Sequence, residues 1–271
     1  MSSKRIIITG AASGIGAATA AELARLGAQV VSLDRNTEQP GIIGCDVRDQ
    51  GSVDEAVGQA VARLGGGLDV LINCAGLATP QSAGLPPDER ALAVVDVNLL
   101  GPWRVTSAAL PALRASRGRV VNVASGMAYV ALPFAPAYAM SKHGITAYSR
   151  ALRLEHGDAI SVTTVYPGYI RTPIQQDSIK FGLSLAGTSP EETIESAVAA
   201  FVRAALGSRP VRDITTTGSG KVNNALCRYA PRSFVDAVIL KRMRKKLAGR
   251  SFTDPAHPVA QFAGRLAGQR R

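Results

Sequence analysis

The chain has 271 residues, of which 46% are hydrophobic and 19% are charged, and its formal net charge is +11 at pH 7. This length suits one domain with an appendage, and the apolar content suffices for a large core. No apolar run reaches the roughly eighteen residues of a membrane-spanning helix, and no Cys/His cluster has the spacing of a metal site. We therefore expect neither a transmembrane segment nor a bound metal.

The first predicted elements are a strand, a glycine-rich turn and a helix. Residues 4–9 are a short apolar run of β-branched residues, which predicts a buried strand. The stretch from Ile15 to Leu26 is rich in Ala, Leu and Glu, which favours a helix, and Gly27 ends it. Free N–H groups at such a helix start attract anions, so the turn predicts a pyrophosphate cradle. The glycines that allow the sharp turn and the close backbone approach are Gly10, Gly14 and Gly16.

A second predicted strand, residues 29–34, ends in Asp34, eighteen residues after Gly16. A carboxylate at this place can accept both ribose hydroxyls of an adenosine and repels a 2′-phosphate, which favours NAD over NADP. The neighbouring Arg35 leaves NADP open, because a guanidinium there could pair with that phosphate. The alternative interpretation of Arg35 is a solvated turn residue.

Strands and helices alternate along the rest of the chain, and nearly every strand is apolar on both faces. This pattern predicts a single doubly wound parallel sheet of Rossmann type with helices on both faces. Catalytic and binding groups should gather at the carboxyl ends of the strands. Ser52 is the expected N-cap of the second helix, with Glu55 completing a capping box. The predicted strands are 41–47, 68–73, 119–124, 160–166 and 211–217, and the predicted helices are 52–64, 88–97, 101–116, 136–155 and 190–206.

Tyr138 and Lys142 carry the clearest chemical signal, with Ser125 thirteen residues upstream. Four residues apart on a helix, the phenol and the amine share one face. A free phenol has a pKa of about 10, and a neighbouring ammonium lowers the pKa of a phenol towards the range useful for acid–base catalysis. We expect Tyr138 to exchange a proton with a substrate oxygen that Ser125 holds by a hydrogen bond. Together with a dinucleotide cradle, this set predicts hydride transfer to or from a carbonyl.

These motifs, in this order, resemble the short-chain dehydrogenase/reductase family in its compact, non-extended kind. The resemblance covers roughly residues 4–217 and implies NAD, or else NADP, as the cofactor, with a tetrad of Asn98, Ser125, Tyr138 and Lys142. It implies that Asn98 keeps an ordered water beside Lys142, and that Lys142 also holds the nicotinamide ribose. The motifs that carry it are Thr9-Gly-x-x-x-Gly14-x-Gly16, Asp46-Val47, Asn73-x-Ala75-Gly76, Asn98, Ser125, Tyr138-x-x-x-Lys142 and Pro167-Gly168.

The same resemblance implies a set of cofactor-binding residues. Asp46 would hydrogen-bond the adenine, Asn73 would lie along the adenosine side and support the sheet, and Thr172 would contact the nicotinamide amide or a phosphate. Cys74 departs from the family, which often has a second Asn there. The full predicted set is Gly10, Ser13, Gly14, Ile15, Gly16, Asp34, Arg35, Asp46, Val47, Asn73, Ala75, Gly76, Tyr138, Lys142, Pro167, Gly168, Ile170 and Thr172.

The excess of positive charge lies in the C-terminal part of the chain. Residues 200–271 hold fifteen Lys and Arg against three Asp and Glu, whereas residues 1–199 are nearly balanced. We divide the chain into a catalytic domain, 1–217, and a basic extension, 218–271. Residues 233–247 predict an amphipathic helix with Val235, Ile239, Met243 and Leu247 on one stripe. Residues 252–271 should be loosely ordered.

Three roles remain open for the helix over 233–247. Its apolar stripe could close the substrate pocket or a subunit contact, or lie on an anionic membrane surface. Its charges could also attract an anionic substrate carrier. No recognition motif accompanies the charge, so we expect no nucleic acid partner. We expect a cytoplasmic protein without a signal peptide, because the three cysteines are widely spaced and the chain starts directly with a strand. Association with a membrane stays open as an alternative, and the family resemblance implies a homo-oligomer.

The expected substrate is a small molecule of apolar character, such as a steroid-, retinoid- or lipid-like secondary alcohol or ketone. A lid over 169–189 and the segment after Ser125 would supply apolar walls. Two alternatives stay open: a 3-oxoacyl-type reductase that acts on carrier-bound acyl chains, and a catalytically silent cofactor-binding sensor. An extended-type epimerase is disfavoured, because its usual glycine spacing and longer substrate domain are absent. The apolar side chains in question are Met127, Tyr129, Val130, Leu132, Phe134, Ile174, Ile179, Phe181, Leu183 and Leu185.

Overall fold

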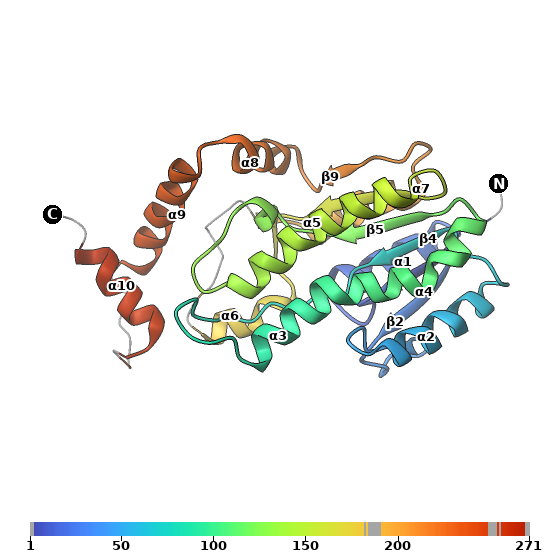
Figure 1. Ribbon diagram of the computed structural model, residues 1–271, viewed down its shortest axis with the longest axis horizontal. Helices are drawn as coiled ribbons and strands as arrows, with labels where there is room; N and C mark the ends of the chain where they lie inside the picture. The colour runs from blue at the N-terminus through green and yellow to red at the C-terminus, as the bar shows by residue number, and fades with distance from the viewer. Residues whose placement is uncertain (1–2, 182, 184–190, 249–253, 255, 269–271) are drawn as a thin grey trace.

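A seven-stranded parallel sheet forms the centre of the computed structural model, which describes residues 3–181, 183, 191–248, 254 and 256–268 (Figure 1). The apolar strand sequences bury both faces, as a parallel sheet requires. A second, two-stranded sheet pairs β7 (Tyr169–Ile170) with β8 (Glu191–Glu192). In spatial order the central strands are β3 (Ile43–Gly44), β2 (Gln29–Asp34), β1 (Arg5–Thr9), β4 (Val70–Asn73), β5 (Arg119–Val123), β6 (Ser161–Tyr166) and β9 (Asp213–Thr215).

Helices cover both faces of this sheet. Helices α1 (Gly14–Arg25) and α7 (Ile194–Leu206) pack over one face, where the buried cluster includes Ile6, Ile8 and Phe201. The other face is covered by α2 (Gln50–Arg63), α4 (Gly101–Ala115) and α5 (Pro136–His156). Successive strand side chains point to opposite faces, so one apolar strand feeds both layers. The predicted doubly wound, Rossmann-type architecture is confirmed.

One helical segment differs from the prediction of two separate helices. Helix α3 (Glu89–Val95) runs directly into a π-helical turn, η1 (Asp96–Leu100), and then into α4. The widened turn is closed by the Gly101 N–H, which donates to the Asp96 carbonyl oxygen five residues back. Such turns are frequent at functional sites. Asn98 lies inside this one.

The predicted N-cap of the second helix was wrong by three residues. Helix α2 begins at Gln50, and its cap is Asp49, whose carboxylate accepts the Ser52 N–H at 2.7 Å. The Ser52 hydroxyl instead accepts the Asp46 N–H at 3.0 Å, so it fixes the loop that carries Asp46. Asp and Ser are both good N-cap residues. Because the Ser52 hydroxyl is bonded to the Asp46 N–H, Asp49 caps the helix instead.

Short elements follow the strands that carry the site. A 3-10 turn, η2 (Gly126–Tyr129), follows β5, and a second one, η3 (Pro173–Gln175), leads into α6 (Gln176–Lys180) after β7. The helix predicted over 190–206 begins at Ile194, because Thr193 caps it by accepting the Ser196 N–H. Of the predicted lid over 169–189, residues 182 and 184–189, including Leu185, lie outside the described residues.

The basic extension is largely helical. After β9 come α8 (Gly218–Tyr229), α9 (Arg232–Leu247) and α10 (Pro258–Gly268), which run along the upper and left side of Figure 1. The prediction that 252–271 is loosely ordered was wrong for α10. Val259 and Leu266 of that helix are buried in a cluster with residues of α9 and the body, so packing stabilises it. The cluster comprises Phe134, Leu183, Met243, Leu247, Val259 and Leu266.

Helix α8 was not predicted, because the glycine-rich Gly218-Ser219-Gly220 suggests a break rather than a helix start. Thr217 caps the helix by accepting the Gly220 N–H at 2.9 Å. Across the described part of the chain, none of the helices combines the length and the hydropathy that crossing a bilayer requires.

Leucines in the helices that cover the sheet differ widely in burial, so their removal should affect stability differently. Leu113 of α4 is fully buried, whereas Leu154 of α5 is 84% exposed. We expect Leu113→Ala to lower the free energy of unfolding by about 2–5 kcal/mol, through lost apolar contact and a residual cavity. The matched Leu154→Ala should stay within about 0.5 kcal/mol of the parent. Urea denaturation of both variants measures this, and equal losses would contradict the packing described.

Candidate active site

The turn between β1 and α1, with the helix start that follows it, favours glycine at three positions. Gly10 and Gly14 have φ angles of +71° and +56°, which side chains rarely adopt. A Cβ on Gly10 would lie 2.6 Å from the Ala75 Cα, and one on Gly16 would lie 2.0 Å from the Gly10 carbonyl oxygen. Ser13, the N-cap of α1, is extended and makes no side-chain cap bond. The first N–H groups of α1 are thus not capped by Ser13, and they fit a bound pyrophosphate.

This turn forms one end of a cavity of about 450 Å³. All predicted site residues except Asn73 and Asn98 line it, so the fold brings together groups from every strand's carboxyl end between β2 and β6. The predicted residues on its wall are Gly10, Ser13, Gly14, Ile15, Gly16, Asp34, Arg35, Asp46, Val47, Ala75, Gly76, Ser125, Tyr138, Lys142, Pro167, Gly168, Ile170 and Thr172.

Asp34 is at the end of the cavity where an adenosine would lie. Its two carboxylate oxygens accept the Ala12 and Asn36 N–H groups, each at 2.9 Å. These bonds fix the carboxylate at the carboxyl end of β2, beside the glycine turn. Each oxygen keeps a free lone pair that a hydroxyl could reach. Arg35 is exposed at the rim.

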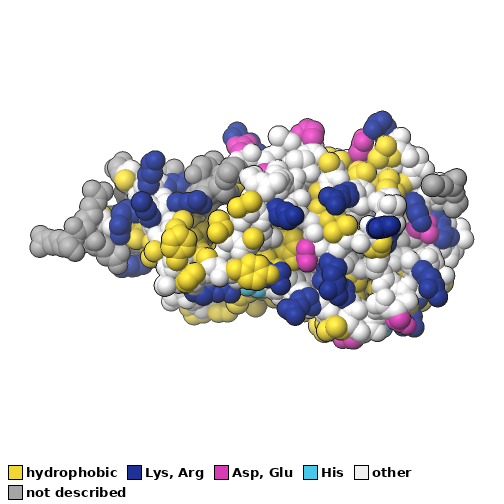
Figure 2. All heavy atoms as spheres, turned by 90° about the horizontal axis from the view of Figure 1, so that it is seen from above, with side chains coloured by type: hydrophobic (Ala, Val, Ile, Leu, Met, Phe, Trp, Pro, Cys, Tyr) yellow, Lys and Arg dark blue, Asp and Glu magenta, His cyan; other side chains and the backbone are white. Residues whose placement is uncertain are grey.

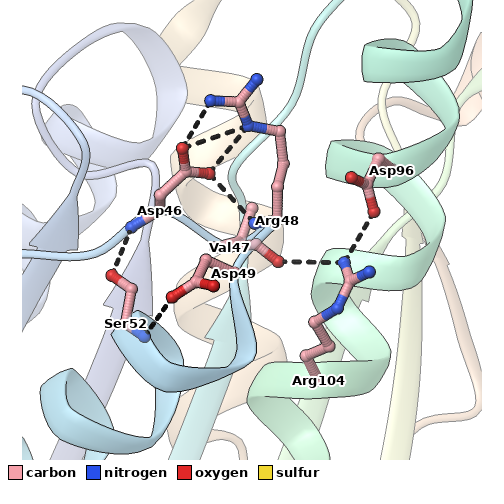
Figure 3. A network of polar contacts seen from close by, with 7 residues as sticks. All are labelled: Asp46, Val47, Arg48, Asp49, Ser52, Asp96 and Arg104. Atoms are coloured by element: carbon pink, nitrogen blue, oxygen red, sulfur yellow. Dashed lines mark hydrogen bonds and ion pairs between the residues drawn. The ribbon is translucent and has the colours of Figure 1, made fainter.

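Asp46 is held by an arginine that sequence reasoning missed. Arg48 makes a two-pronged ion pair with the Asp46 carboxylate, with nitrogen–oxygen distances from 2.5 to 3.1 Å (Figure 3). This contact is the main cause that lowers the pKa of Asp46 to about 2. Arg48 lines the cavity as well. Its place two residues after Asp46 was the only signal in the sequence.

A second arginine anchors the same loop from the neighbouring helix. Arg104 of α4 donates to the Val47 carbonyl oxygen at 3.3 Å and to the Asp96 carboxylate at 2.7 Å (Figure 3). The loop after β3 is therefore tied to the π-helical turn that holds Asn98. Val47 also touches this helix directly, since a Cβ on Gly101 would lie 2.8 Å from its Cγ2.

Asn73 and Asn98 are both buried behind the cavity wall. The Asn73 side chain donates to Asn122 at 2.8 Å and to Thr106 at 3.0 Å, so it braces the middle of the sheet. The Asn98 side chain accepts the Leu77 N–H at 2.7 Å and donates to the Leu77 carbonyl oxygen at 2.8 Å. Asn98 thereby fixes the backbone next to Gly76.

Ser125, Tyr138 and Lys142 converge at the other end of the cavity. Ser125 follows β5, and its hydroxyl accepts the Met127 N–H at 3.1 Å. Tyr138 and Lys142 lie on the first two turns of α5. The Lys142 ammonium donates to the Val123 carbonyl oxygen at 2.9 Å and lies 5.6 Å from the centre of the Tyr138 ring. One helix and one strand end thus fix all three groups.

Burial governs the protonation of these groups. It raises the pKa of the Tyr138 phenol, and a hydrogen bond with Ser125 opposes this effect only in part. Burial also lowers the pKa of Lys142 to about 8. The prediction that Lys142 depresses the pKa of the phenol is therefore wrong for the chain without bound molecules, because desolvation raises the pKa of Tyr138 and only the Ser125 hydrogen bond opposes it. The arrangement keeps a protonated phenol beside Ser125 at neutral pH.

A second cavity, of about 610 Å³, shares seven lining residues with the first, and Ser125 and Tyr138 are among them. Its walls are mostly apolar and come from the segment after Ser125 and from α8 and α9. Val235, Ile239 and Met243 of the predicted stripe face inward here. This size is typical of sites for drug-sized molecules. The apolar lining includes Met127, Val130, Leu132, Phe134, Ile174, Leu226, Phe234, Val235, Val238, Ile239 and Met243.

Glu192, which sequence reasoning also missed, joins both cavities to the extension. Its carboxylate accepts the Gly168 N–H at 3.0 Å and hydroxyl groups from Thr216 and Thr217, the latter at 2.6 Å. The start of α8 is thus linked to the Pro167–Gly168 loop. The partners are 24 or 25 residues from Glu192, so no local pattern could reveal the contact.

Comparison with known proteins decides the family. The family model described as short chain dehydrogenase matches residues 4–181. The chain belongs to the short-chain dehydrogenase family. L-fucose dehydrogenase from Bos taurus is 32% identical over 205 residues, which cover 70% of this chain and 72% of that protein.

Two solved structures show how this family member compares in three dimensions. A short chain dehydrogenase from Burkholderia cenocepacia J2315, in complex with NADP, superposes with a TM-score of 0.74 at 25% identity and covers 89% of this chain and 100% of that one. A 3-ketoacyl-(acyl-carrier-protein) reductase from Brucella melitensis, complexed with NADH, has a TM-score of 0.68 at 25% identity, with coverages of 78% and 96%. This short-chain dehydrogenase is an oxidoreductase that uses a nicotinamide cofactor.

Gly16 allows a direct test of the cradle. Gly16→Ala places a methyl group against the Gly10 carbonyl oxygen, so the turn must open, and we expect NAD(H) binding to weaken by about tenfold or more. Gly58→Ala is the matched control, because a Cβ there meets nothing within 4 Å and alanine favours the helix. Fluorescence titration with NADH measures both. Unchanged affinity in Gly16→Ala would contradict the predicted cradle.

The lowered pKa of Lys142 makes the stability of the protein depend on pH. Between the folded pKa of about 8 and the ordinary value of 10.5, the unfolded chain binds the proton and the folded chain does not. Stability from this group therefore rises with pH across that window. Relative to Lys142→Met, the parent should gain up to about 3 kcal/mol of unfolding free energy from pH 8 to pH 10.5. A constant difference between the two proteins across this pH range would show that folding does not lower the pKa of Lys142.

Proposed function

We propose that the protein interconverts a secondary alcohol and a ketone of apolar character, with Tyr138 as the acid and base. The observation that carries this proposal is the meeting of the two cavities at Ser125 and Tyr138. A cofactor in the first cavity and a substrate in the second would face each other across these two side chains. When bound, the nicotinamide ring supplies or accepts the hydride.

The side chains of the chain itself handle the proton. During reduction the Tyr138 phenol gives its proton to the carbonyl oxygen, and the Ser125 hydroxyl holds that oxygen and stabilises its developing charge. During oxidation the phenolate takes the proton from the alcohol. Because burial raises the pKa of Tyr138, the phenol is protonated at neutral pH, the form that ketone reduction requires.

The proposed cofactor residues divide into two groups. The glycine turn and Ser13 would hold the pyrophosphate, and Asp34 the adenosine ribose. We favour NAD, because Asp34 would repel a 2′-phosphate. NADP stays the alternative, since Arg35 and Arg48 both line the same end of the cavity. Titration with both coenzymes separates these possibilities.

The apolar substrate is supported by the lining of the second cavity. Its walls offer aliphatic and aromatic side chains over most of its length, and such walls favour an apolar skeleton. A carrier-bound acyl chain is the second candidate, because the same apolar walls could hold an acyl chain. The similarity to a relative named for a sugar substrate makes small polar alcohols a necessary comparison.

One set of assays tests this proposal. Steroid and long-chain aliphatic ketones, an acetoacetyl thioester and L-fucose would be compared as substrates by nicotinamide absorbance. We expect the highest kcat/KM with an apolar ketone or alcohol, and turnover confined to sugars would overturn the proposed substrate class.

Tyr138→Phe tests the proposed proton transfer. Removing the hydroxyl should lower kcat by about 10²-fold or more and leave NADH binding unchanged, because general acid–base catalysis supplies factors of that size. Tyr148→Phe, on the same helix but outside both cavities, is the matched control. A rate independent of Tyr138 would remove it from the mechanism, and NADH binding without any turnover would favour the silent sensor.

A further inference from the structure

An exposed apolar stripe runs along α8. Val222, Leu226 and Tyr229 follow one another at intervals of four and three residues, so they share one face of the helix. Their side chains are 63%, 57% and 75% exposed, and none of the residues of α8 is buried. Phe234, in the first turn of α9, is 60% exposed. We call these four residues the α8 patch. Contiguous exposed apolar groups of this kind mark interaction surfaces.

Cations surround the α8 patch. Lys221, Arg228 and Arg232 are exposed beside it, and residues 214–235 contain no Asp or Glu. The Arg228 guanidinium lies 5.3 Å from the ring centre of Tyr229, and Arg232 donates to the Tyr129 carbonyl oxygen at 2.8 Å. Viewed from above α8, hydrophobic side chains gather over α8 and α9 with Lys and Arg side chains around them (Figure 2). The surface is therefore apolar in the middle and positive at its edge.

The α8 patch differs from the helix over 233–247, for which the sequence left a membrane contact open as one of three roles. Met243 and Leu247 of that stripe are buried, and Val235 and Ile239 line the substrate cavity. The apolar stripe of α9 thus packs inside the protein. The apolar stripe of α8 is not covered by any of the residues that the structure describes. Leu226 and Phe234 belong both to the patch and to the cavity wall, so the patch borders the place where the cavity reaches the surface.

We propose that the α8 patch docks on an anionic phospholipid surface. Its apolar side chains would enter the headgroup boundary, while Lys221, Arg228 and Arg232 would lie among the phosphates, as in interfacial amphipathic helices. A second copy of the chain is a poorer partner. A symmetric contact would set the same positive edge against itself, which repels. The charge pattern therefore selects a negative partner.

Vesicle flotation of the full chain tests this proposal. The probes are vesicles of phosphatidylcholine with about one third phosphatidylserine, and vesicles of phosphatidylcholine alone. We expect binding to the anionic vesicles and about tenfold or more weaker binding to the neutral ones, because each cation near the surface adds attraction. Raising the salt from about 0.1 M to about 0.5 M should weaken binding, since it screens these charges.

The variant that isolates the patch is Val222→Ser with Tyr229→Ser. Neither residue lines a cavity described above, so NADH binding should be unchanged, while binding to anionic vesicles should fall by about tenfold or more. Leu26→Ser with Leu85→Ser, at exposed positions elsewhere, is the control. No vesicle binding by the parent, or undiminished binding by the patch variant, would overturn the proposal. So would a dimer in light scattering that the patch variant abolishes, with no binding to vesicles.

Discussion

A buried ammonium joins helix α5 to the end of strand β5. The Lys142 Nζ donates to the Val123 carbonyl oxygen at 2.9 Å. Lys142 lies one helical turn after Tyr138, and Val123 lies two residues before Ser125. This single bond spans both elements that carry the reactive groups, so it fixes their separation. Its cost is desolvation, which lowers the pKa of Lys142 to about 8. The protein thus holds a costly charge at the one point where it sets the geometry of the site.

The direction of the parallel strands explains why one edge of the sheet carries the first cavity and why the C-terminal helices cover that edge. Parallel strands place their carboxyl ends at one edge, and the glycine turn, Asp34 and Ser125 all meet the first cavity there. The same edge leaves the reacting side open to solvent, and α8 and α9 cover it. Glu192 holds the start of α8 to Gly168, so the cover is attached to the loop beside the cofactor cavity. The extension thus turns apolar side chains of α9 towards the second cavity, and its exposed α8 patch is bordered by cations.

The sequence predicted the sheet, its order of strands and helices, and the cavity residues because these depend on local patterns. Apolar β-branched runs, a glycine turn and a Tyr-x-x-x-Lys helix are each readable within a few residues. The errors arose where distant contacts decide. Packing against α9 makes α10 a helix, the loop around Asp46 shifts the cap of α2, and burial raises the pKa of Tyr138. Arg48 and Glu192 act through partners that no periodicity reveals.

In the proposed mechanism, the cofactor cavity and the substrate cavity meet at the reacting atoms. A crystal structure of the protein with NAD and a secondary alcohol measures this directly. We expect the reactive nicotinamide carbon and the alcohol carbon to lie about 3–3.5 Å apart, with the alcohol oxygen within hydrogen-bond reach of both the Tyr138 and the Ser125 hydroxyl. A nicotinamide ring bound away from Tyr138, or an alcohol whose oxygen contacts neither hydroxyl, would contradict it.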